Sequence, residues 1–592
     1  MTDLTGQVSD WIDRLEGALA QPTEADIAAL FHPDAIWRDL VALTWNIHPS
    51  EGTAAILKML TENAEGLRDF QLIGEARSVE DWIEAEFKFA TRAVRGRGHV
   101  RLKNGRAWTL LTSAEELLER PWAEGRQREI GTHHGRQPGR IGWGEARAAE
   151  AAQLGADEDP DVVIIGGGQG GMALGARLKS LGVSNVILEK RARAGDSWRD
   201  RYESLCLHDP VWYDHMPYIP FPAGWPVFTP KDRMADWLEM YARVMALEYW
   251  AGSTALRATR DGARWEVTVD RQGERLTLRP RHLVFATGMS GYARVPEFDG
   301  ADDFAGQQIH SSEYRTGRDH QGATAVVIGA NTSAHDICHD LWEHGVPVTM
   351  IQRSSTLVAR SDNVVQNLLA PLYSEDALAA GITTERADFL ATTWPWALMA
   401  DRIKPLAKRM AEQDSDLHAR LRAVGFMLDN GEDGAGIPLK SARRGGGFYI
   451  DVGASGLIAD GEVSLISGQQ VARLDPDGVV LEDGQKLPCD LVIYATGYGS
   501  MNQFVGDLCG QEMADQIGRV WGLGSGLDTD PGPWQGELRN MWKPTSVDGL
   551  LFQGGNLAQS RHYSRFLAMQ IKARLSGIET PVYAPAPASP GG

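Results

Sequence analysis

Two glycine-rich turns have the residue types and spacing that suit a dinucleotide. The first lies in DVVIIGGGQGG (161–171), where an apolar run leads into Gly-x-Gly-x-x-Gly and an amphipathic helix. Its first glycine permits a tight bend, the second lets a diphosphate approach the backbone, and the third brings helix against strand. The next apolar strand ends in an acid that can accept hydrogen bonds from ribose hydroxyls. We therefore predict a nucleotide site that includes Gly166, Gly168, Gln169, Gly171, Glu189 and Lys190.

The second turn lies in VVIGANTSAHD (326–336) and departs from strict glycine. It places Asn331 where the middle glycine would stand, and we expect this residue to tolerate a left-handed backbone. The following strand ends in Arg353 rather than an acid, and an arginine there can grip a 2′-phosphate bidentately. Charge-assisted bonds of about 1.5–3 kcal/mol would favour NADPH roughly ten- to a hundredfold. The alternative is that Arg353 is an ordinary surface arginine. The predicted residues of this site are Gly329, Asn331, Ser333 and Arg353.

The length and charge of the chain limit what it can be. Its 592 residues exceed one core, and the net charge of −20 argues against nucleic acid and anionic membranes as partners. The N-terminus lacks the features of a secretory signal, and the chain lacks an apolar run long enough to span a bilayer, so we expect a cytoplasmic protein. Four scattered cysteines predict neither a metal site nor the redox pair of a disulfide reductase.

Residues 1–130 form a separate predicted unit. In WIEAEFKFA (82–90) apolar and charged residues alternate, and Asn104–Gly105 is a strong hairpin signal. Helices followed by long antiparallel strands resemble the SnoaL-like, nuclear-transport-factor-like fold. This fold is cone-shaped. The hairpin carries a basic cluster that could bind an anion or be a solvated face: Arg92, Arg95, Arg97, Arg101, Lys103 and Arg106.

A second set of polar residues lies near the start of the unit and could line the mouth of the cone or be structural: His32, Asp34, Arg38 and Asp39.

The segment between the two turns carries a more specific pattern. FAGQQIHSSEY (304–314) has the spacing Phe304-x-Gly306-x-x-x-His310-x-x-x-Tyr314, and RAGDSW (193–198) follows the first βαβ unit. Together they are similar to the flavin-containing monooxygenases, class B of the flavin monooxygenases, over about residues 160–575. Baeyer–Villiger enzymes of that class carry Trp where this chain has Tyr314, which favours the flavin-containing monooxygenase branch.

The resemblance assigns FAD to the first turn and NADPH to the second. It implies that Asp196 and Trp198 lie near the flavin, with Asp196 in place of a family glycine. LVFATG (283–288) and LVIYATGY (491–498) would mark the crossings between the two nucleotide domains, which adds Thr496 and Gly497. Gly555 would precede a helix aimed at the flavin.

The same resemblance implies a reaction. NADPH would reduce FAD, dioxygen would form a flavin C4a-(hydro)peroxide, and one oxygen atom would pass to nitrogen, sulfur or a carbonyl carbon of a small organic substrate. The catalytic candidates are His208, His310 and Asn331. His310 would couple hydride delivery to domain positioning. Many members have Asn near the position of His208. A histidine there resembles the subgroup that includes the plant indole-pyruvate oxygenases, and also bacterial type II enzymes with an extended N-terminus, some of which oxidise ketones. His208 is either a hydrogen-bond donor or a core histidine.

The predicted fold is α/β, with two Rossmann-like dinucleotide-binding domains, the second inserted in the first, preceded by an α+β cone-shaped domain. Its predicted parts are 1–130, a linker at 131–159, the FAD domain at 160–320 and 489–578, the NADPH domain at 321–488, and a disordered tail at 579–592. The first part could bind substrate, cap the active site or form a homodimer. Alternative functions are a Baeyer–Villiger ketone oxygenase, an NADPH oxidase or reductase, and a non-catalytic flavoprotein sensor.

Overall fold

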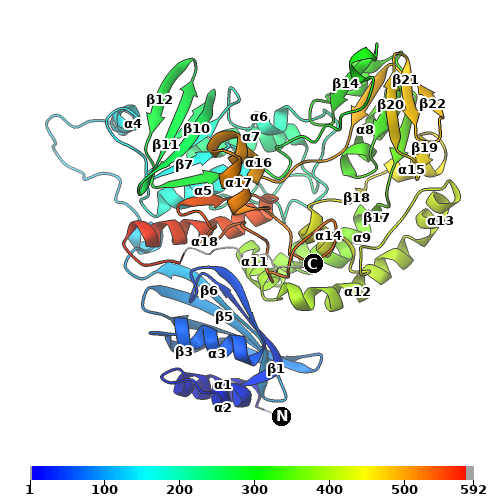
Figure 1. The fold of residues 1–592 in the computed structure, drawn as a ribbon. Helices are drawn as coiled ribbons and strands as arrows, with labels where there is room; N and C mark the ends of the chain where they lie inside the picture. Colours follow the sequence, from blue (N-terminus) through cyan, green and yellow to red (C-terminus); the bar gives the residue numbers. More distant parts are fainter. Residues whose placement is uncertain (1–2, 582–592) are drawn as a thin grey trace.

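Three large sheets organise the chain, and they lie in three lobes (Figure 1). The computed structural model describes residues 3–581. A six-stranded sheet forms the N-terminal lobe, and two five-stranded parallel sheets form the first and second nucleotide lobes. Of the tail predicted at 579–592, residues 582–592 lie outside the described residues.

The N-terminal lobe is a mixed sheet with three helices. Its strand order is β2-β1-β6-β5-β4-β3, in which only β1 and β6 run parallel. The predicted hairpin is confirmed: Asn104 and Gly105 have φ of 50° and 74°, as a two-residue turn between these strands requires. Its elements are α1 (Leu4–Ala18), α2 (Glu24–Leu30), β1 (Phe31–Leu40), β2 (Ile47–Glu51), α3 (Gly52–Asn63), β3 (Arg68–Val79), β4 (Trp82–Ala90), β5 (Val94–Lys103) and β6 (Arg106–Leu117).

The charged face of this sheet is only partly exposed: the expectation of a solvated face holds for Arg92, Arg95 and Arg106 of the hairpin, whereas Arg101 and two glutamates of β4 are buried. Glu84 and Glu86 of β4 are 7% and 8% exposed. Glu86 pairs with Arg386 at 2.8 Å, a residue far along the chain. The basic hairpin is also paired internally, since Arg92, Arg95, Arg97, Arg101 and Lys103 each meet a glutamate or aspartate of this lobe. These pairs leave the anion-binding interpretation without support.

The polar group near the first strand is structural rather than the lining of an open mouth. The Asp39 carboxylate accepts hydrogen bonds from the backbone of Leu43 and Thr44 and from the Thr112 hydroxyl. Arg38 points out of the lobe and pairs with Glu537. His32 contacts Asp34 at the surface.

The first nucleotide lobe is built from two separate segments of chain. Its parallel sheet has the order β24-β13-β7-β8-β9, and a three-stranded antiparallel sheet, β10-β11-β12, is added to it. Its strands are β7 (Val162–Ile165), β8 (Asn185–Glu189), β9 (Tyr249–Ala251), β10 (Ser253–Asp261), β11 (Arg264–Arg271), β12 (Glu274–Leu278), β13 (His282–Phe285) and β24 (Leu550–Phe552). Its helices are α5 (Gln169–Ser180), α6 (Asp196–Arg199), α7 (Lys231–Val244), α16 (Asn502–Cys509), α17 (Gln511–Ile517) and α18 (Leu557–Leu575).

The second nucleotide lobe repeats this plan between β13 and β24. Its parallel sheet has the order β14-β23-β15-β16-β19, with an added antiparallel sheet β20-β21-β22. The predicted insertion of one Rossmann-like unit in another is confirmed. Its elements are β14 (Gln307–His310), β15 (Ala325–Ile328), α8 (Thr332–Glu343), β16 (Val348–Gln352), α15 (Ala454–Ala459), β19 (Ser464–Ser467), β20 (Val471–Asp475), β21 (Gly478–Leu481), β22 (Lys486–Pro488) and β23 (Leu491–Tyr494).

The predicted boundaries of the second lobe, 321 and 488, are too narrow. Strands β14 and β23 pair with each other, and β23 pairs with β15, so both belong to this sheet. Each strand has only four residues, and the sequence pattern placed them in the first nucleotide domain.

A helical segment extends from the second lobe. It lies between the short strands β17 (Leu357–Arg360) and β18 (Phe448–Asp451), which pair in parallel. It was not separated from the NADPH domain by sequence reasoning. Its helices are α9 (Ser361–Val364), the π-helical turn η4 (Val365–Leu369), α10 (Glu375–Ala379), α11 (Thr384–Thr392), α12 (Trp396–Gln413), α13 (Ser415–Ala423) and α14 (Gly436–Arg444).

The predicted linker, 131–159, is not entirely irregular. It contains α4 (Trp143–Gln153), a helix without a buried residue. Trp143, its first residue, is 74% exposed, and Ile130, just before the predicted linker, is 78% exposed.

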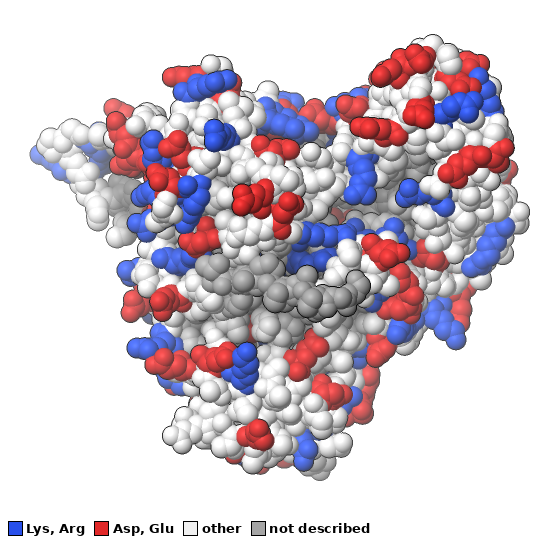
Figure 2. Space-filling model, viewed as in Figure 1, with Lys and Arg blue, Asp and Glu red and all other residues white. Residues whose placement is uncertain are grey.

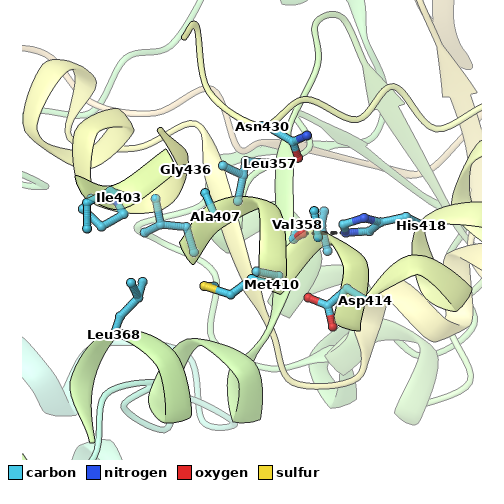
Figure 3. Close-up of a pocket in the computed structure, with 14 residues that line it drawn as sticks. Leu357, Val358, Leu368, Ile403, Ala407, Met410, Asp414, His418, Asn430 and Gly436 are labelled. Atoms are coloured by element: carbon cyan, nitrogen blue, oxygen red, sulfur yellow. Dashed lines mark hydrogen bonds between the residues drawn. The ribbon is translucent and has the colours of Figure 1, made fainter. Parts of the chain in front are cut away.

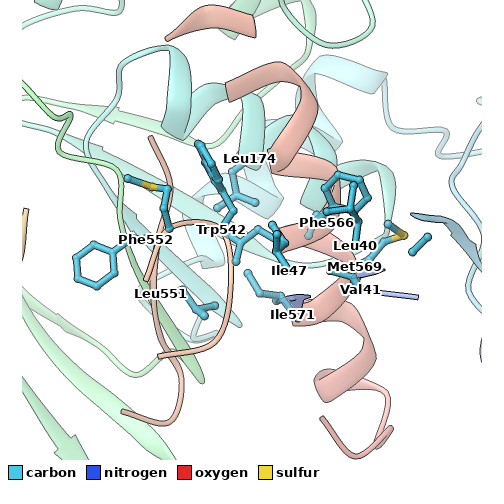
Figure 4. Packing of buried hydrophobic residues seen from close by; sticks show 14 of the residues in the cluster. Leu40, Val41, Ile47, Leu174, Trp542, Leu551, Phe552, Phe566, Met569 and Ile571 are labelled. Carbon is cyan, nitrogen blue, oxygen red and sulfur yellow. The ribbon is translucent and has the colours of Figure 1, made fainter. Parts of the chain in front are cut away.

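One apolar core runs through the N-terminal lobe and the first nucleotide lobe. Leu40, Val41 and Ile47 of the former belong to the same buried cluster as Phe566 and Ile571 of α18 (Figure 4). Because the cluster is continuous, the two lobes are packed as one body rather than tethered. Among residues 3–581, no helix combines the length and the apolar character needed to cross a bilayer.

Candidate functional site

The two predicted glycine turns have the same backbone arrangement. Gly166 has φ of 110°, and a Cβ added to it would lie 2.4 Å from the carbonyl oxygen of Ala286. Gly329 has φ of 133°, and its added Cβ would lie 2.3 Å from the carbonyl oxygen of Ala495. Both alanines belong to the Ala-Thr-Gly sequences that follow β13 and β23. Each Ala-Thr-Gly turn therefore passes directly against one nucleotide turn, where a side chain on the glycine would collide with backbone.

The first turn leaves the start of α5 free to receive an anion. Gly168 is the N-cap of α5, and its backbone region faces open space, since an added Cβ would meet only Ser197 Oγ at 3.9 Å. A helix start without a side-chain cap offers unpaired N–H groups and the positive end of the helix dipole. Gly171 has the predicted packing role, because its added Cβ would lie 2.1 Å from the Gly166 carbonyl oxygen.

The second turn has the same form without a left-handed residue at its middle position. Asn331 is the N-cap of α8 with φ of −101°, so the tolerance of asparagine for a left-handed backbone is not needed at this position. Extended φ is open to any residue, and asparagine here needs no special conformational freedom. Ala334 is buried where the third glycine would stand, which is consistent with close packing of α8 on β15.

A single large cavity joins the two turns. It has a volume of about 2170 Å³. Ligand pockets commonly measure roughly 300–1,000 Å³, so this space exceeds what one ligand needs. In Figure 2 basic side chains gather at the hollow between the two nucleotide lobes. The cations that line the cavity are Lys190, Arg191, Arg201, Arg294, Arg315, Arg353, Arg444 and Arg519.

Most of the predicted site residues line this cavity. They are Gly166, Gly168, Gln169, Glu189, Lys190, Trp198, His208, Asn331, Ser333, Arg353, Thr496, Gly497 and Gly555. Gly171, Asp196, His310 and Gly329 are not among the lining residues. Asp196 is turned away, because its carboxylate pairs with Arg193 and Arg199 at 2.9 and 3.0 Å.

The residues around the first turn fit a dinucleotide such as FAD. The buried Glu189 carboxylate accepts from the Gly167 and Arg191 N–H groups, both at 2.9 Å, which holds it at the end of β8. The hydroxyls of Ser197 and Thr287 line the cavity but are buried without a hydrogen-bond partner among the described residues. Buried hydroxyls normally have partners, so two orphans beside an uncapped helix start indicate a polar ligand.

The residues around the second turn fit a phosphorylated dinucleotide. Arg353 lines the cavity at the end of β16 and has no ion-pair partner among residues 3–581. Gln352 beside it is fully buried and bonds to Met427, so Arg353 is the side chain that remains available. A free guanidinium at this place supports the predicted 2′-phosphate contact.

His208 lies at the boundary between the two nucleotide lobes. Its Nε2 is 3.8 Å from Asp336 Oδ2, and Asp336 belongs to α8 of the second lobe. The Tyr202 hydroxyl donates to the same carboxylate at 2.6 Å. Burial raises the pKa of Asp336, although His208 and Tyr202 both oppose the shift. His208 is therefore part of a contact between lobes rather than an isolated core histidine.

The four residues of the pattern at 304–314 hold the second sheet in place and do not line the cavity, although Ser312 and Glu313 between them do. Phe304 packs in a core cluster, and Gly306 passes the Asp490 carbonyl, 2.3 Å from where a Cβ would stand. His310 Nδ1 accepts from the Ser312 backbone, which leaves Nε2 to donate to the Gly497 carbonyl at 3.2 Å. The Tyr314 hydroxyl donates to Asp340 of α8. His310 thus fixes the Ala-Thr-Gly turn that lines the cavity.

Sequence reasoning missed several acids of the cavity wall, among them Asp336 and Asp209. Asp336 lies four residues after Thr332, which also lines the cavity, so both share one face of α8 and the position of Asp336 could have been inferred. Asp209 follows His208 directly and also lines the cavity. Burial raises its pKa to about 6, and it is close enough to raise the pKa of Asp214 further.

The cysteines do not supply a disulfide exchange centre. All four are free, and Cys206 is the one that lines the cavity within the described chain. Burial raises the pKa of Cys338, Cys489 and Cys509, which disfavours reactive thiolates.

The chain is similar to several known proteins. Residues 163–392 match the family described as "Pyridine nucleotide-disulphide oxidoreductase". "Indole-3-pyruvate monooxygenase YUCCA1" of Oryza sativa subsp. japonica is 31% identical over 345 residues, which cover 58% of this chain and 77% of that protein. "Indole-3-pyruvate monooxygenase YUCCA4" of the same organism is 31% identical over 355 residues, covering 58% and 74%. The solved structure "OTEMO complex with FAD and NADP" shares the fold at 18% identity and a TM-score of 0.50, covering 71% and 86%.

Proposed function

This chain belongs to the family of flavin-dependent monooxygenases, with FAD and NADPH as its cofactors, and we propose that it inserts one oxygen atom of O₂ into a small organic substrate at nitrogen, sulfur or a carbonyl carbon. The observation that carries the proposal is the shared cavity. Both nucleotide turns, the cationic Arg353 and the histidine–carboxylate contact open onto one space. A disulfide reductase would need a second cysteine beside Cys206, and the cavity lining has none among the described residues.

The binding roles follow from the two turns. We assign FAD to Gly166, Gly168, Glu189 and the orphan hydroxyls, and NADPH to the start of α8 and Arg353. The chemistry that these cofactors supply is hydride transfer from NADPH to the flavin and activation of dioxygen by the reduced flavin.

The protein's own contribution is orientation. The Asp336 carboxylate, which accepts from the Tyr202 hydroxyl, lies 3.8 Å from His208 Nε2, so a positioned carboxylate faces the imidazole at the meeting point of the lobes. The proton on His310 Nε2 is held by the Gly497 carbonyl and is not available to a substrate. His208 is accordingly the hydrogen-bonding residue at the cavity wall, and His310 and Asn331 are positioning residues.

Two further assignments belong to the same proposal. The N-terminal lobe, with three helices on a six-stranded sheet, is consistent with a SnoaL-like fold. Four free cysteines support a reducing, cytoplasmic environment.

The experiment is a substrate panel under isotopically labelled dioxygen. Thioethers, amines, bicyclic ketones and 2-oxo acids are incubated with the holoenzyme, and NADPH consumption and product mass are measured together. We expect one labelled oxygen atom in the product of at least one class. NADPH consumption that yields only hydrogen peroxide with every class would support an oxidase, and no consumption at all would support a sensor.

A further inference from the structure

The cavity has an apolar end that lies away from both glycine turns in the sequence and comes from the helical segment. Its lining includes Leu368, Leu369, Trp394, Trp396, Met399 and Ile403. A second cavity of about 20 Å³ lies beside it, and the two spaces share Leu368, Ile403, Ile437 and Pro438. Figure 3 shows Leu368, Ile403, Ala407 and Met410 around this second cavity. A wall of this composition suits an uncharged, apolar part of a substrate, whereas nucleotide phosphates need the cationic part.

The position of this apolar wall depends on the short connection between α11 and α12, residues 392–396, which we call the α11–α12 corner. Helix α11 ends at Thr392, and α12 begins at Trp396. Thr392, Trp394 and Trp396 all line the cavity, so a shift of the corner would move three wall residues together. Helix ends leave carbonyl groups without intrahelical partners, and those groups need donors when they are buried.

The donors at this corner come from the N-terminal lobe. Arg38 of β1 donates to the Thr392 carbonyl at 2.6 Å and is held by the Glu537 carboxylate. Arg101 of β5 donates to the Thr393 carbonyl at 2.9 Å and to its hydroxyl at 2.7 Å. Both arginines are 3% exposed. Two cations at the C-terminal end of a helix also complement its dipole.

Aromatic and cation–π contacts of Trp394 also hold the α11–α12 corner. The Arg101 guanidinium lies 3.6 Å from the centre of the Trp394 ring, and Arg402 lies 3.8 Å from it. Trp394 meets Trp82 and Trp108 of the N-terminal sheet edge-on, at 5.8 and 5.9 Å between ring centres. Trp394 therefore touches the N-terminal lobe while it also lines the cavity.

We propose that the N-terminal lobe is a specificity element of the enzyme, in which Arg38 and Arg101 hold the α11–α12 corner and thereby shape the apolar wall that receives the substrate. This inference rests on the proposed function, because it names the substrate end of the same cavity. Arg38 and Arg101 are positioning residues, since they act through Thr392, Thr393 and Trp394. The contact between the N-terminal lobe and the helical segment also explains why Glu84, Glu86 and Arg101 on β4 and β5 are buried.

The test compares the holoenzyme with the variants Arg101→Gln, Arg101→Lys and Thr393→Val. The lysine variant keeps the charge but loses the forked geometry, and the valine variant removes one acceptor from the other side of the interface. The matched control is Arg95→Gln, on the same strand, whose ion pair with Glu116 lies at the surface. Three quantities are measured: amide hydrogen exchange over residues 384–404, KM for the panel substrate that the wild type oxidises, and the rate at which NADPH reduces the flavin.

We expect Arg101→Gln to speed exchange in the corner and to raise KM, each about tenfold, which corresponds to about 1.4 kcal/mol. Flavin reduction by NADPH should stay at the wild-type rate, and the control should match the wild type in all three measurements. Arg101→Lys and Thr393→Val should show the same pattern more weakly.

Wild-type exchange and KM in all three variants would overturn the inference while leaving the monooxygenase assignment intact. Loss of soluble yellow protein in all three would also overturn it, since the contact would then be a folding requirement only. Failure of NADPH to reduce the flavin of the wild type would instead count against the proposed function.

Discussion

His208 of the first nucleotide lobe and Asp336 of the second lie 3.8 Å apart, measured from Nε2 to Oδ2. This contact links the two nucleotide sites, because Asp336 follows the second turn on α8 and His208 lines the cavity beside the first lobe. The pair connects the orientation of an active-site imidazole with the relative position of the lobes.

Asp336→Asn tests this link. Asparagine can still accept the Tyr202 hydrogen bond but loses the charge that faces His208, so we expect normal flavin content and flavin reduction slowed on the order of tenfold, about 1.4 kcal/mol in the barrier. Stopped-flow reduction by NADPH measures the rate. The control is Glu343→Gln, a surface residue near the end of the same helix. An unchanged rate in Asp336→Asn would show that the contact has no part in hydride delivery.

Arg353→Ala tests the choice of nicotinamide cofactor. The guanidinium lines the cavity without a protein partner in the described chain, so its removal should not disturb the fold. Loss of a charge-assisted contact of about 1.5–3 kcal/mol should raise KM for NADPH roughly ten- to a hundredfold. KM for NADH should not change. The surface variant Arg473→Ala should leave both constants unaltered, and an equal rise for both cofactors would contradict a 2′-phosphate contact.

Gly166→Ala and Gly329→Ala separate the two nucleotide sites. In each case the new Cβ would meet a backbone carbonyl oxygen, at 2.4 and 2.3 Å, which has no room to move aside. At a strain of about 1–3 kcal/mol we expect Gly166→Ala to retain roughly a tenth of the wild-type flavin or less. Gly329→Ala should stay yellow but need far more NADPH for reduction.

The matched control for these glycines is Gly456→Ala. This helical glycine has nothing within 4 Å of an added Cβ. It should match the wild type in flavin content and in reduction. Full flavin in Gly166→Ala would refute the assignment of the first turn.

Asp209→Asn tests the buried acid of the cavity wall through stability. Burial raises the pKa of the folded carboxyl to about 6 from an ordinary value near 3.8, so the folded state binds the proton more tightly than the unfolded state. Stability from this group is complete below pH 3.8 and is lost as pH rises through 6. Asparagine removes that loss, and we expect the apparent unfolding temperature at pH 8 to rise by about 1–3 °C.

The pH profile provides the check on this sign. The gain from Asp209→Asn should vanish at pH values below 3.8, where the wild-type acid is mostly protonated in both states. Asp261→Asn, at an exposed turn, should shift neither end of the profile. A variant that is less stable than the wild type at pH 8 would show that the ionised carboxylate is favoured in the folded protein.

The sequence predicted the parts of the site that depend on local pattern. Gly166 and Gly329 were recognisable because strand, turn and helix follow one another within a few residues, and the two Ala-Thr-Gly sequences were found as a matching pair. Their purpose became visible only in three dimensions, where Ala286 and Ala495 lie against those glycines.

Contacts between distant segments could not be predicted. Arg101 and Thr393 are in contact but lie far apart in the chain. The alternation of apolar and charged residues in β4 and β5 cannot show that part of the charged face is covered by α11 and α12. The backbone at Asn331 could not be predicted either: a glycine position in a motif does not require a left-handed backbone, and φ at that residue is −101°. The four-residue strands β14 and β23 were too short for their sheet to be assigned from pattern.

The most direct test of the whole account is to add NADPH to the purified holoenzyme without oxygen and to follow the visible absorbance of the flavin. We expect a yellow protein whose absorbance bleaches with one equivalent of NADPH and returns when oxygen is admitted. A protein that stays colourless after incubation with excess FAD, or a bound flavin that NADPH does not bleach, would contradict it.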